Sequence, residues 1–321
     1  MVDIAFDVQY GGIPSYICPI FAFMTHYLHC PVCNAGSIQS AFSATDHTVT
    51  KENFSIWRCD SCTLLFTQDI PTQEQIGKYY QSENYISHSD TQKGFINRLY
   101  HRIRKTTLAS KMQLVIKETG LQMGSMLDVG CGTGAFLHTM QKNSWKVTGL
   151  EPDAGARKTA RELYNIQPLP SHDIFKLPAH SFNAITAWHV MEHVHQLHEY
   201  VEQLKKLLAQ NGRIFIAVPN YTAADATAYK SLWAAYDVPR HLYHFSPKSM
   251  RTLMEMHGLK VEKLEAMWFD SFYASMLSEQ YKNGGGNIIR AFFNGFFSNV
   301  KAFIDKEKCS SIIYVITLGS T

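Results

Sequence analysis

The chain has 321 residues, 45% of them hydrophobic, which is enough to bury a full α/β core and leaves room for one small accessory module. Its formal net charge is +3, from 30 basic and 27 acidic residues without a run of like charge, so the composition gives no indication of a nucleic-acid-binding surface. Four of the seven cysteines form two Cys-x-x-Cys pairs, a pattern more typical of a reducing compartment than of a disulfide framework. We therefore expect a cytoplasmic protein.

The N-terminal segment, residues 1–24, contains an apolar stretch over Ile13–Met24. Two prolines interrupt the stretch, aspartates precede it where a secretory signal carries positive charge, and it is too short to span a bilayer. We interpret residues 1–24 as an extension ahead of the folded chain, with Met24 as an alternative first residue.

The paired cysteines lie within residues 25–70. Cys30 and Cys33 form one pair and Cys59 and Cys62 the other, and each pair can present two thiolates to one tetrahedral zinc ion. A site with four cysteine ligands and no open position is typically structural, so this region predicts a small zinc ribbon that the ion holds together. The alternative, a redox-active dithiol, is disfavoured because there are two pairs and neither adjoins the glycine-rich loop described below.

Residues 71–119 follow a helical pattern and form a predicted connector or cap. Apolar residues recur along one face of the expected helix at Leu99, Ile103, Leu108, Met112 and Ile116. Aromatic and histidine residues precede this face, and they either close over a functional site or pack against the fold: Tyr79, Tyr80, Tyr85 and His88.

Residues 120–321 alternate short apolar runs with amphipathic stretches, as a parallel sheet covered by helices requires. This pattern predicts an α/β fold with helices on both faces of the sheet and a helical insert at about residues 271–306. The expected strands are Met126–Val129, Lys146–Leu150, Asn183–Trp188, Arg213–Val218, Leu259–Met267 and Ser311–Leu318. The expected helices include Ala135–Asn143, Ala154–Tyr164 and Leu197–Ala209.

A glycine-rich loop, Asp128–Gly134, follows the first of these strands. Glycines at a strand-to-helix turn let a ligand approach the backbone N–H groups of a helix N-terminus, which suits a ribose or an anionic group. The loop also fits the dinucleotide pattern G-x-G-x-x-A, and Glu151 lies about 20 residues on, where a ribose-binding acid belongs. The loop alone is therefore compatible with a nicotinamide dinucleotide and with a different nucleoside cofactor.

Five motifs in order over residues 125–220 resemble those of class I S-adenosylmethionine-dependent methyltransferases: Leu127–Gly134, Leu150–Asp153, His172–Asp173, His189–Val194 and Gly212–Asn220. The resemblance implies a Rossmann-like sheet of seven strands and an enzyme that transfers the methyl group of S-adenosylmethionine to a small-molecule acceptor. Two alternatives are an NAD-dependent oxidoreductase that uses the same loop and a zinc-ribbon RNA-modifying methyltransferase. The near-neutral charge balance argues against the second.

The same resemblance implies individual contacts to the cofactor. Glu151 would accept hydrogen bonds from both ribose hydroxyls, and Asp173 would accept one from the adenine amino group. Pro152 and Ile174 would lie against the faces of the adenine ring. The other predicted cofactor contacts, of which the first two face the methionine end, are Asp128, Gly130, Cys131, Gly132, Gly134 and His189.

The segment after the strand Asn183–Trp188 carries His189, Glu192 and His193 in the pattern H-x-x-E-H, which is a metalloprotease signature in other folds. Here the pattern follows a strand, and no third ligand on a following helix is evident. The segment also resembles that of ubiquinone-type O-methyltransferases, in which two acids and a histidine hold a divalent ion beside a phenolic acceptor. Because His189 replaces the first acid, the resemblance gives only weak support for Mg²⁺, and a hydrogen-bonded turn that closes the cofactor pocket is the alternative.

A second polar cluster, Asp237–Phe245, follows the fifth strand of the expected sheet, where the acceptor pocket of this fold opens. Zinc-ribbon sugar C-methyltransferases have a Glu-His pair at a similar place as the general base. His241 matches that histidine and is the predicted catalytic base, with His193 and Glu192 as further catalytic candidates. Arg240 stands in place of the acid, and it either clamps a carboxylate or phosphate of the substrate or pairs with the aspartate that opens the cluster.

An apolar segment, Ala291–Phe297, lies in the predicted helical insert between Arg290 and Lys301. This pattern favours either association with a membrane surface, without insertion, or packing on the protein's own fold. We expect the main partner to be a small-molecule acceptor of the sugar, cell-envelope or quinone type, methylated on oxygen or carbon, and we expect no nucleic acid. The sequence does not determine the oligomeric state.

Overall fold

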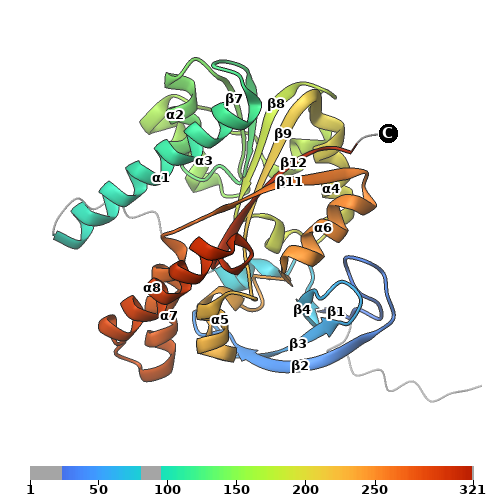
Figure 1. Cartoon of the computed structure of the whole chain (residues 1–321). Coiled ribbons are helices and arrows are strands. Elements are labelled where there is room, and N and C mark those ends of the chain that lie inside the picture. The colour runs from blue at the N-terminus through green and yellow to red at the C-terminus, as the bar shows by residue number, and fades with distance from the viewer. Residues whose placement is uncertain (1–23, 81–94, 320–321) are drawn as a thin grey trace, which may run out of the picture.

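The computed structural model describes residues 24–80 and 95–319 (Figure 1). The predictions for residues 1–23, Tyr85 and His88 lie outside the described residues. Among the helices described, none combines the length and the apolar character needed to cross a membrane.

The centre of the molecule is a mixed sheet in the order β11-β12-β9-β8-β6-β7. Strands β7, β6, β8 and β9 are parallel, and β12 runs antiparallel to both β9 and β11. The predicted Rossmann-like arrangement is confirmed, because each expected strand coincides with an observed one. The strands are β6 (Ser125–Val129), β7 (Lys146–Leu150), β8 (Phe182–Trp188), β9 (Leu208–Pro219), β11 (Leu259–Ala266) and β12 (Ser311–Leu318).

The described sheet has six strands instead of the seven predicted, because the outermost strand is reduced to one residue. Leu169 forms a parallel bridge beside Leu150, and its N–H donates to the Gly149 carbonyl across 2.8 Å. Prolines stand on both sides, at positions 168 and 170, and neither has an N–H to donate to a ladder. The position of the seventh strand is thus occupied, but the strand cannot extend.

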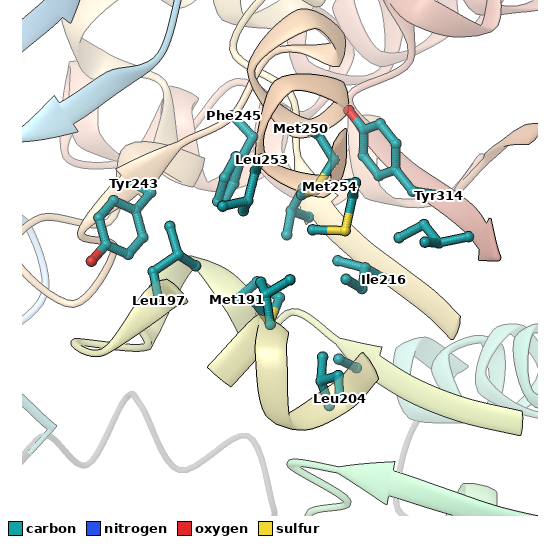
Figure 2. Close-up of a cluster of buried hydrophobic side chains, with 14 of the residues drawn as sticks. Met191, Leu197, Leu204, Ile216, Tyr243, Phe245, Met250, Leu253, Met254 and Tyr314 are labelled. Carbon is teal, nitrogen blue, oxygen red and sulfur yellow. The ribbon is translucent and has the colours of Figure 1, made fainter. Parts of the chain in front are cut away.

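Helices cover both faces of the sheet, and alternate residues of each strand face opposite ways. On β12, Tyr314 packs in a cluster with helices α4 and α6, whereas Val315 packs in a cluster with α1 and α2. Figure 2 shows the first cluster, where Leu204 of α4 and Leu253 of α6 converge. The helices are α1 (Phe95–Thr119), α2 (Ala135–Lys142), α3 (Ala154–Tyr164), α4 (Leu197–Leu207), α5 (Ala224–Tyr229), α6 (Pro247–Met256), α7 (Asp270–Asn283) and α8 (Ile288–Ile304).

The N-terminal module is a second, antiparallel sheet in the order β10-β4-β3-β2. Its edge strand β10 comes from the second half of the chain, since Tyr243 pairs with Phe66 and His244 with Leu65. The loop that carries His241 is therefore tied to this module by main-chain hydrogen bonds. The strands are β2 (Ile38–Thr45), β3 (Asn53–Cys59), β4 (Leu65–Thr67) and β10 (Tyr243–His244), and a separate pair is formed by β1 (Met24–Thr25) and β5 (Ile70–Pro71).

The helical insert is present between β11 and β12 as the pair α7 and α8. Figure 1 shows the two helices side by side at one end of the molecule, next to α5. Short 3₁₀ helices complete the described chain: η2 (Ile76–Tyr80), η3 (Ser171–Lys176), η4 (Met191–His193), η5 (Lys230–Leu232), η6 (Ala234–Tyr236) and η7 (Lys306–Lys308).

Candidate functional site

The glycine-rich loop joins the carboxyl end of β6 to α2. Gly130, Gly132 and Gly134 have φ angles of +67°, +53° and +79°, a conformation that favours glycine. A Cβ on Gly130 would lie 2.6 Å from Cγ2 of Val190, so this position also has no room for a side chain. The loop thus forms the tight glycine turn between strand and helix that the sequence predicts, and the N–H groups of Cys131, Gly132 and Gly134 are hydrogen-bonded within the chain.

Glu151 follows β7 and faces this loop. Its Oε2 accepts a hydrogen bond from the Gly132 N–H across 2.8 Å, and its Oε1 accepts one from the Asp153 N–H across 2.9 Å. Each carboxylate oxygen keeps a lone pair for a further donor, such as a ribose hydroxyl. The structure thus brings together the loop and the acid that the sequence assigns to one nucleoside.

Asp128 is buried beneath the loop instead of opening onto it. Its Oδ1 accepts a 2.6 Å hydrogen bond from the Thr186 hydroxyl on β8, and only 1% of the residue is exposed. Burial raises the pKa of Asp128 to about 7, and the Thr186 hydrogen bond and Lys111 partly oppose this shift. A contact from this carboxyl to the methionine end of a cofactor stays a prediction.

Two residues with predicted cofactor contacts are buried. Ile174 is fully buried in the core and its carbonyl accepts a hydrogen bond from Gln203, and its contact with an adenine ring stays a prediction. Cys131 is also buried, and its N–H is bonded to the Leu150 carbonyl at 3.0 Å, which holds the loop against β7. Pro152 is exposed and Asp173 partly exposed, in positions open to a ligand.

His189 lies at the end of β8 and bridges two carboxylates. Its Nδ1 lies 3.3 Å from Oε1 of Glu192, and its Nε2 lies 3.0 Å from Oδ2 of Asp270 at the start of α7. Burial lowers the pKa of His189, but the hydrogen bonds to Asp270 and Glu192 outweigh burial and raise it to about 10. His189 is therefore an imidazolium at neutral pH, and its predicted contact with the cofactor remains untested.

Glu192 is fully buried and only one of its oxygens is engaged. Within the described part of the chain, Oε2 has no hydrogen-bond partner. Burial acts to raise the pKa of Glu192, but the hydrogen bond and charge of His189 outweigh it and lower the pKa. Ligand atoms of Glu192, His193 and His241 all lie within 4.8 Å of one another, so the structure brings the three predicted catalytic residues together.

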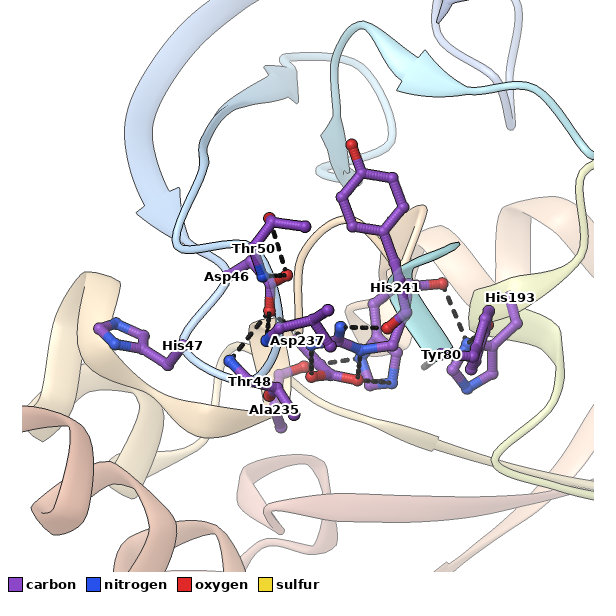
Figure 3. Close-up of polar contacts among 12 residues, drawn as sticks. Asp46, His47, Thr48, Thr50, Tyr80, His193, Ala235, Asp237 and His241 are labelled. Carbon is purple, nitrogen blue, oxygen red and sulfur yellow. Dashed lines mark hydrogen bonds and ion pairs between the residues drawn. The ribbon is translucent and has the colours of Figure 1, made fainter. Parts of the chain in front are cut away.

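Hydrogen bonds fix the tautomers of the two histidines (Figure 3). Nδ1 of His193 lies 3.0 Å from the Arg240 carbonyl, and Nδ1 of His241 lies 2.8 Å from the Ala235 carbonyl. Because a carbonyl only accepts, both Nδ1 atoms carry the hydrogen and both Nε2 atoms keep a lone pair. Burial and the neighbouring His241 lower the pKa of His193 to about 4, so this imidazole is neutral.

Arg240 does not face an acceptor, and the prediction that it clamps a substrate anion is wrong. Its guanidinium is fully buried, and the Nη2 atom donates to Asp46 of the N-terminal module at 3.0 Å and to Asp237 at 2.6 Å. Its Nη1 atom donates to the Tyr79 carbonyl at 2.8 Å. The alternative, in which Arg240 pairs with Asp237 and holds the loop, is confirmed. The ion pair with Asp46 also ties the loop to the N-terminal module.

The four paired cysteines converge in the N-terminal module. The Sγ atoms of Cys30 and Cys62, and those of Cys33 and Cys59, are 3.5 Å apart. Tetrahedral zinc with Zn–S bonds of about 2.3 Å places sulfur atoms roughly 3.8 Å apart, so the cluster fits one zinc ion. The distances are far longer than a disulfide bond of about 2.05 Å.

The structure adds Asp270, which the sequence did not assign to the site, and it places Tyr80 of the predicted connector in contact with the site. The hydroxyl of Tyr80 lies 3.1 Å from Nδ1 of His193, and Asp270 holds His189 from the start of α7. For Tyr80 the sequence leaves two possibilities, closing over a functional site or packing against the fold, and the contact with His193 favours the first. Asp270 carries no comparable signal, because nothing near it in the sequence indicates a partner 81 residues away.

Comparisons with known proteins agree with this architecture. The curated relatives include the mitochondrial ubiquinone biosynthesis O-methyltransferase of Rattus norvegicus, 26% identical over 163 residues (46% of this chain and 47% of that protein). They also include the ubiquinone biosynthesis O-methyltransferase of Glaesserella parasuis, 33% identical over 118 residues (33% and 50%). The chain thus spans about half the length of these relatives.

Solved structures with similar folds include a SAM-dependent methyltransferase from Archaeoglobus fulgidus, with a TM-score of 0.46, 17% identity and coverage of 70% of this chain and 99% of that one. Another is magnesium protoporphyrin IX methyltransferase from Synechocystis PCC 6803, with a TM-score of 0.48, 13% identity and coverage of 75% and 97%. The family model described as a methyltransferase domain matches residues 95–264, which is more than half of the 321 residues. The chain therefore belongs to the methyltransferase-domain family.

Proposed function

We propose that this protein transfers the methyl group of S-adenosylmethionine to a hydroxyl oxygen of a small-molecule acceptor. The observation that carries the proposal is the cluster of Glu192, His193 and His241, whose ligand atoms lie within 4.8 Å of one another and in which Oε2 of Glu192 has no hydrogen-bond partner among the described residues. The cluster lies just past the carboxyl ends of β8 and β9, where open α/β sheets bind ligands. The names of the curated relatives, which are O-methyltransferases, favour oxygen over carbon.

The donor is proposed to bind along the glycine-rich loop. Glu151 accepts hydrogen bonds from the ribose hydroxyls, Gly130, Gly132 and Gly134 allow close approach, and Asp173 and Pro152 flank the adenine. We propose that Asp128 and Cys131 contact the cofactor through main-chain atoms, because their side chains are buried. His189 would contact it through the face of its ring, because both ring nitrogens are paired.

The chemistry needs a base because a hydroxyl acceptor loses a proton as it gains the methyl group. We assign this role to Nε2 of His241, which takes the proton while the acceptor oxygen bonds to the methyl carbon. The sulfonium sulfur keeps the electron pair of the broken bond and leaves as a thioether. Glu192 stabilises the imidazolium that forms, and His193, whose pKa is about 4, stays neutral and orients the acceptor.

A divalent ion is a second candidate occupant of the same cluster, favoured by the mutual distances of its ligand atoms. Two imidazole nitrogens and one carboxylate oxygen are a donor set for zinc or another first-row transition metal, whereas Mg²⁺ prefers oxygen ligands. The predicted Mg²⁺ is therefore the less suitable ion. Full turnover by a chain that carries a single zinc ion, in the cysteine cluster, and no further activation by Zn²⁺, Co²⁺ or Mg²⁺ supports the imidazole base, whereas turnover that requires a second metal equivalent supports the metal.

We further propose that residues 25–70 form a structural zinc ribbon bound through Cys30, Cys33, Cys59 and Cys62. The convergence of the four sulfur atoms supports this assignment. The described cysteines form no disulfide bond, and residence in the cytoplasm stays a proposal.

The function is tested by incubating the purified chain with methyl-labelled S-adenosylmethionine and a low-molecular-weight metabolite extract, with total RNA as a separate substrate. We expect label in small molecules, bound as an O-methyl group, together with release of S-adenosylhomocysteine. Label that enters only RNA supports the RNA-modifying alternative and contradicts the proposal.

A further inference from the structure

Helix α8 has its large apolar side chains on the solvent side and its small residues toward the protein. Ala291, Gly295, Ser298 and Ala302 are buried, and a Cβ on Gly295 would lie 2.7 Å from the Phe272 ring of α7. This polarity is the reverse of an ordinary surface helix, which turns its apolar stripe inward. The exposed face consists of Ile288, Ile289, Phe292, Phe293, Phe296, Phe297, Val300, Phe303 and Ile304, and the last two are more than 80% exposed.

The exposed apolar surface continues from α8 onto α7. Phe272 and Phe292 stack with ring centroids 5.6 Å apart, which joins the two helices at their common edge. Beyond this edge Trp268, Phe269, Tyr273 and Met276 are also exposed, at 40% to 62%. Contiguous apolar surface on this scale marks contact with another apolar phase or partner.

Basic groups border this apolar face. Arg290 and Lys301 lie on the same edge of α8, three turns apart, because eleven residues are close to three helical turns, and Arg290 pairs with Glu279 of α7 at 3.3 Å. The helix contains no Asp or Glu. At its C-terminal end, Lys301 and Lys308 line a hollow of about 390 Å³ together with Thr222, Thr227, Ala224, Ile304 and Asp305. The two ammonium groups are donors suited to a phosphate ester, whereas the hydroxyls of Thr222 and Thr227 already donate to Asn220 and to the Ala223 carbonyl.

We propose that the α7–α8 pair rests on an anionic phospholipid surface, with the exposed face of α8 in the apolar layer and a headgroup phosphate at Lys301 and Lys308. An amphipathic helix with a basic edge lies in the plane of such a surface, and no described helix is built to cross it. A second copy of the chain fits less well, because α8 has basic residues at its edge and no acidic residue for the other copy's basic edge to pair with.

Surface binding would bring the site to the membrane, a consequence that rests on the proposed function. The α7–α8 pair is linked to the proposed acceptor site through His189. This imidazole contacts Asp270, the first residue of α7, with one nitrogen and Glu192 of the site with the other. The acceptor class that this geometry suits is a hydroxyl compound that carries a hydrocarbon tail and partitions into lipid.

The test is flotation of the full chain with vesicles of phosphatidylcholine alone and vesicles of equal parts phosphatidylcholine and phosphatidylglycerol. The wild-type chain is expected to float with the anionic vesicles. The double variant Phe297→Ser/Phe303→Ser is expected to lose on the order of 100-fold in partitioning, and Lys301→Gln/Lys308→Gln roughly 30-fold. Matched controls at exposed positions outside this face, Leu163→Ser and Lys158→Gln, are expected to partition like wild type.

The proposal is overturned if the wild-type chain binds neither kind of vesicle, or if the Phe297→Ser/Phe303→Ser variant floats as well as wild type. It is also overturned if the wild-type chain binds no vesicle but forms a dimer in sedimentation equilibrium that this variant abolishes. Circular dichroism and thermal unfolding of each variant confirm that it is folded. Because flotation needs no catalysis, a negative result leaves the methyl transfer proposal intact, and failure of that proposal leaves flotation unaffected.

Discussion

His193 donates its Nδ1 hydrogen to the main-chain carbonyl of Arg240 across 3.0 Å, and this contact joins the end of β8 to the loop that carries His241. Arg240 is itself anchored by Asp46, which belongs to the N-terminal module. The proposed base and the cysteine cluster are therefore parts of one connected structure. The module positions the acceptor side of the site, while the glycine-rich loop and Glu151 position the donor side independently.

Replacing Arg240 with methionine should destabilise the fold strongly. The change leaves the buried carboxylate of Asp46 without its cationic partner, and breaking a buried pair in this way costs about 3–5 kcal/mol. Chemical denaturation of Arg240→Met and of Arg58→Met measures the difference. Arg58 pairs with Asp60 on the surface, where a pair contributes about 0–1 kcal/mol. Equal free energies of unfolding for the two variants would show that Arg240 does not hold the modules together.

Removal of zinc should abolish methyl transfer while S-adenosylmethionine still binds. The metal holds the module to which β10 and Arg240 attach, whereas the glycine-rich loop belongs to the other sheet. We expect one zinc per chain by elemental analysis, loss of zinc and turnover in Cys59→Ser, and retained zinc in the control Cys309→Ser. A Cys59→Ser protein that turns over at the wild-type rate contradicts the structural role of the ion.

The ion pair formed by His189 should make stability depend on pH. Because folding raises the pKa of His189 to about 10 from an ordinary value of about 6.5, its stabilising contribution is complete below pH 6.5 and disappears as the pH rises toward 10. The difference in unfolding free energy between wild type and His189→Gln should therefore shrink from neutral to alkaline pH.

The same pKa gives a direct spectroscopic measurement. Asp270→Asn removes one of the two carboxylates and should lower the pKa of His189 by about 1 to 3 pH units, measured by NMR titration of the imidazole. Asp69→Asn, which removes an exposed carboxylate that pairs with a different histidine, is the matched control and should leave the pKa of His189 unchanged. An unshifted His189 would mean that Asp270 does not contact it in solution.

Substitution of the proposed base should separate catalysis from binding. His241→Ala should lower turnover by about 10²- to 10⁴-fold, the usual contribution of a general base, and leave the affinity for S-adenosylmethionine unchanged. His26→Ala, at an exposed histidine, is the matched control. If His241→Ala retains full turnover, proton transfer belongs to another group and the histidine is structural.

The sequence predicts features that depend on neighbouring residues better than those that depend on distant ones. The glycine-rich loop is formed by a strand, a turn and a helix start in direct succession, and its conformation follows the prediction. The role of Arg240 depends on Asp46, which lies 194 residues away, and no local pattern distinguishes a buried anchor from a substrate clamp.

The loss of the seventh strand follows from sequence in a different way. Prolines at positions 168 and 170 remove the main-chain N–H donors on both sides of Leu169, so a ladder cannot extend there. The prediction of seven strands followed the family resemblance and did not take these two prolines into account. The resemblance gives the order of the strands, and the prolines determine how long this one can be.

The identity of the donor is tested most directly by calorimetric titration of the purified chain with S-adenosylmethionine and, separately, with NAD. We expect saturable binding of S-adenosylmethionine with one site per chain and no binding of NAD. Glu151→Ala should weaken the affinity about tenfold or more through loss of charged hydrogen bonds to the ribose. Glu162→Ala, at an exposed glutamate of α3, should bind as wild type does. Tight binding of NAD without binding of S-adenosylmethionine would contradict the proposed methyl transfer.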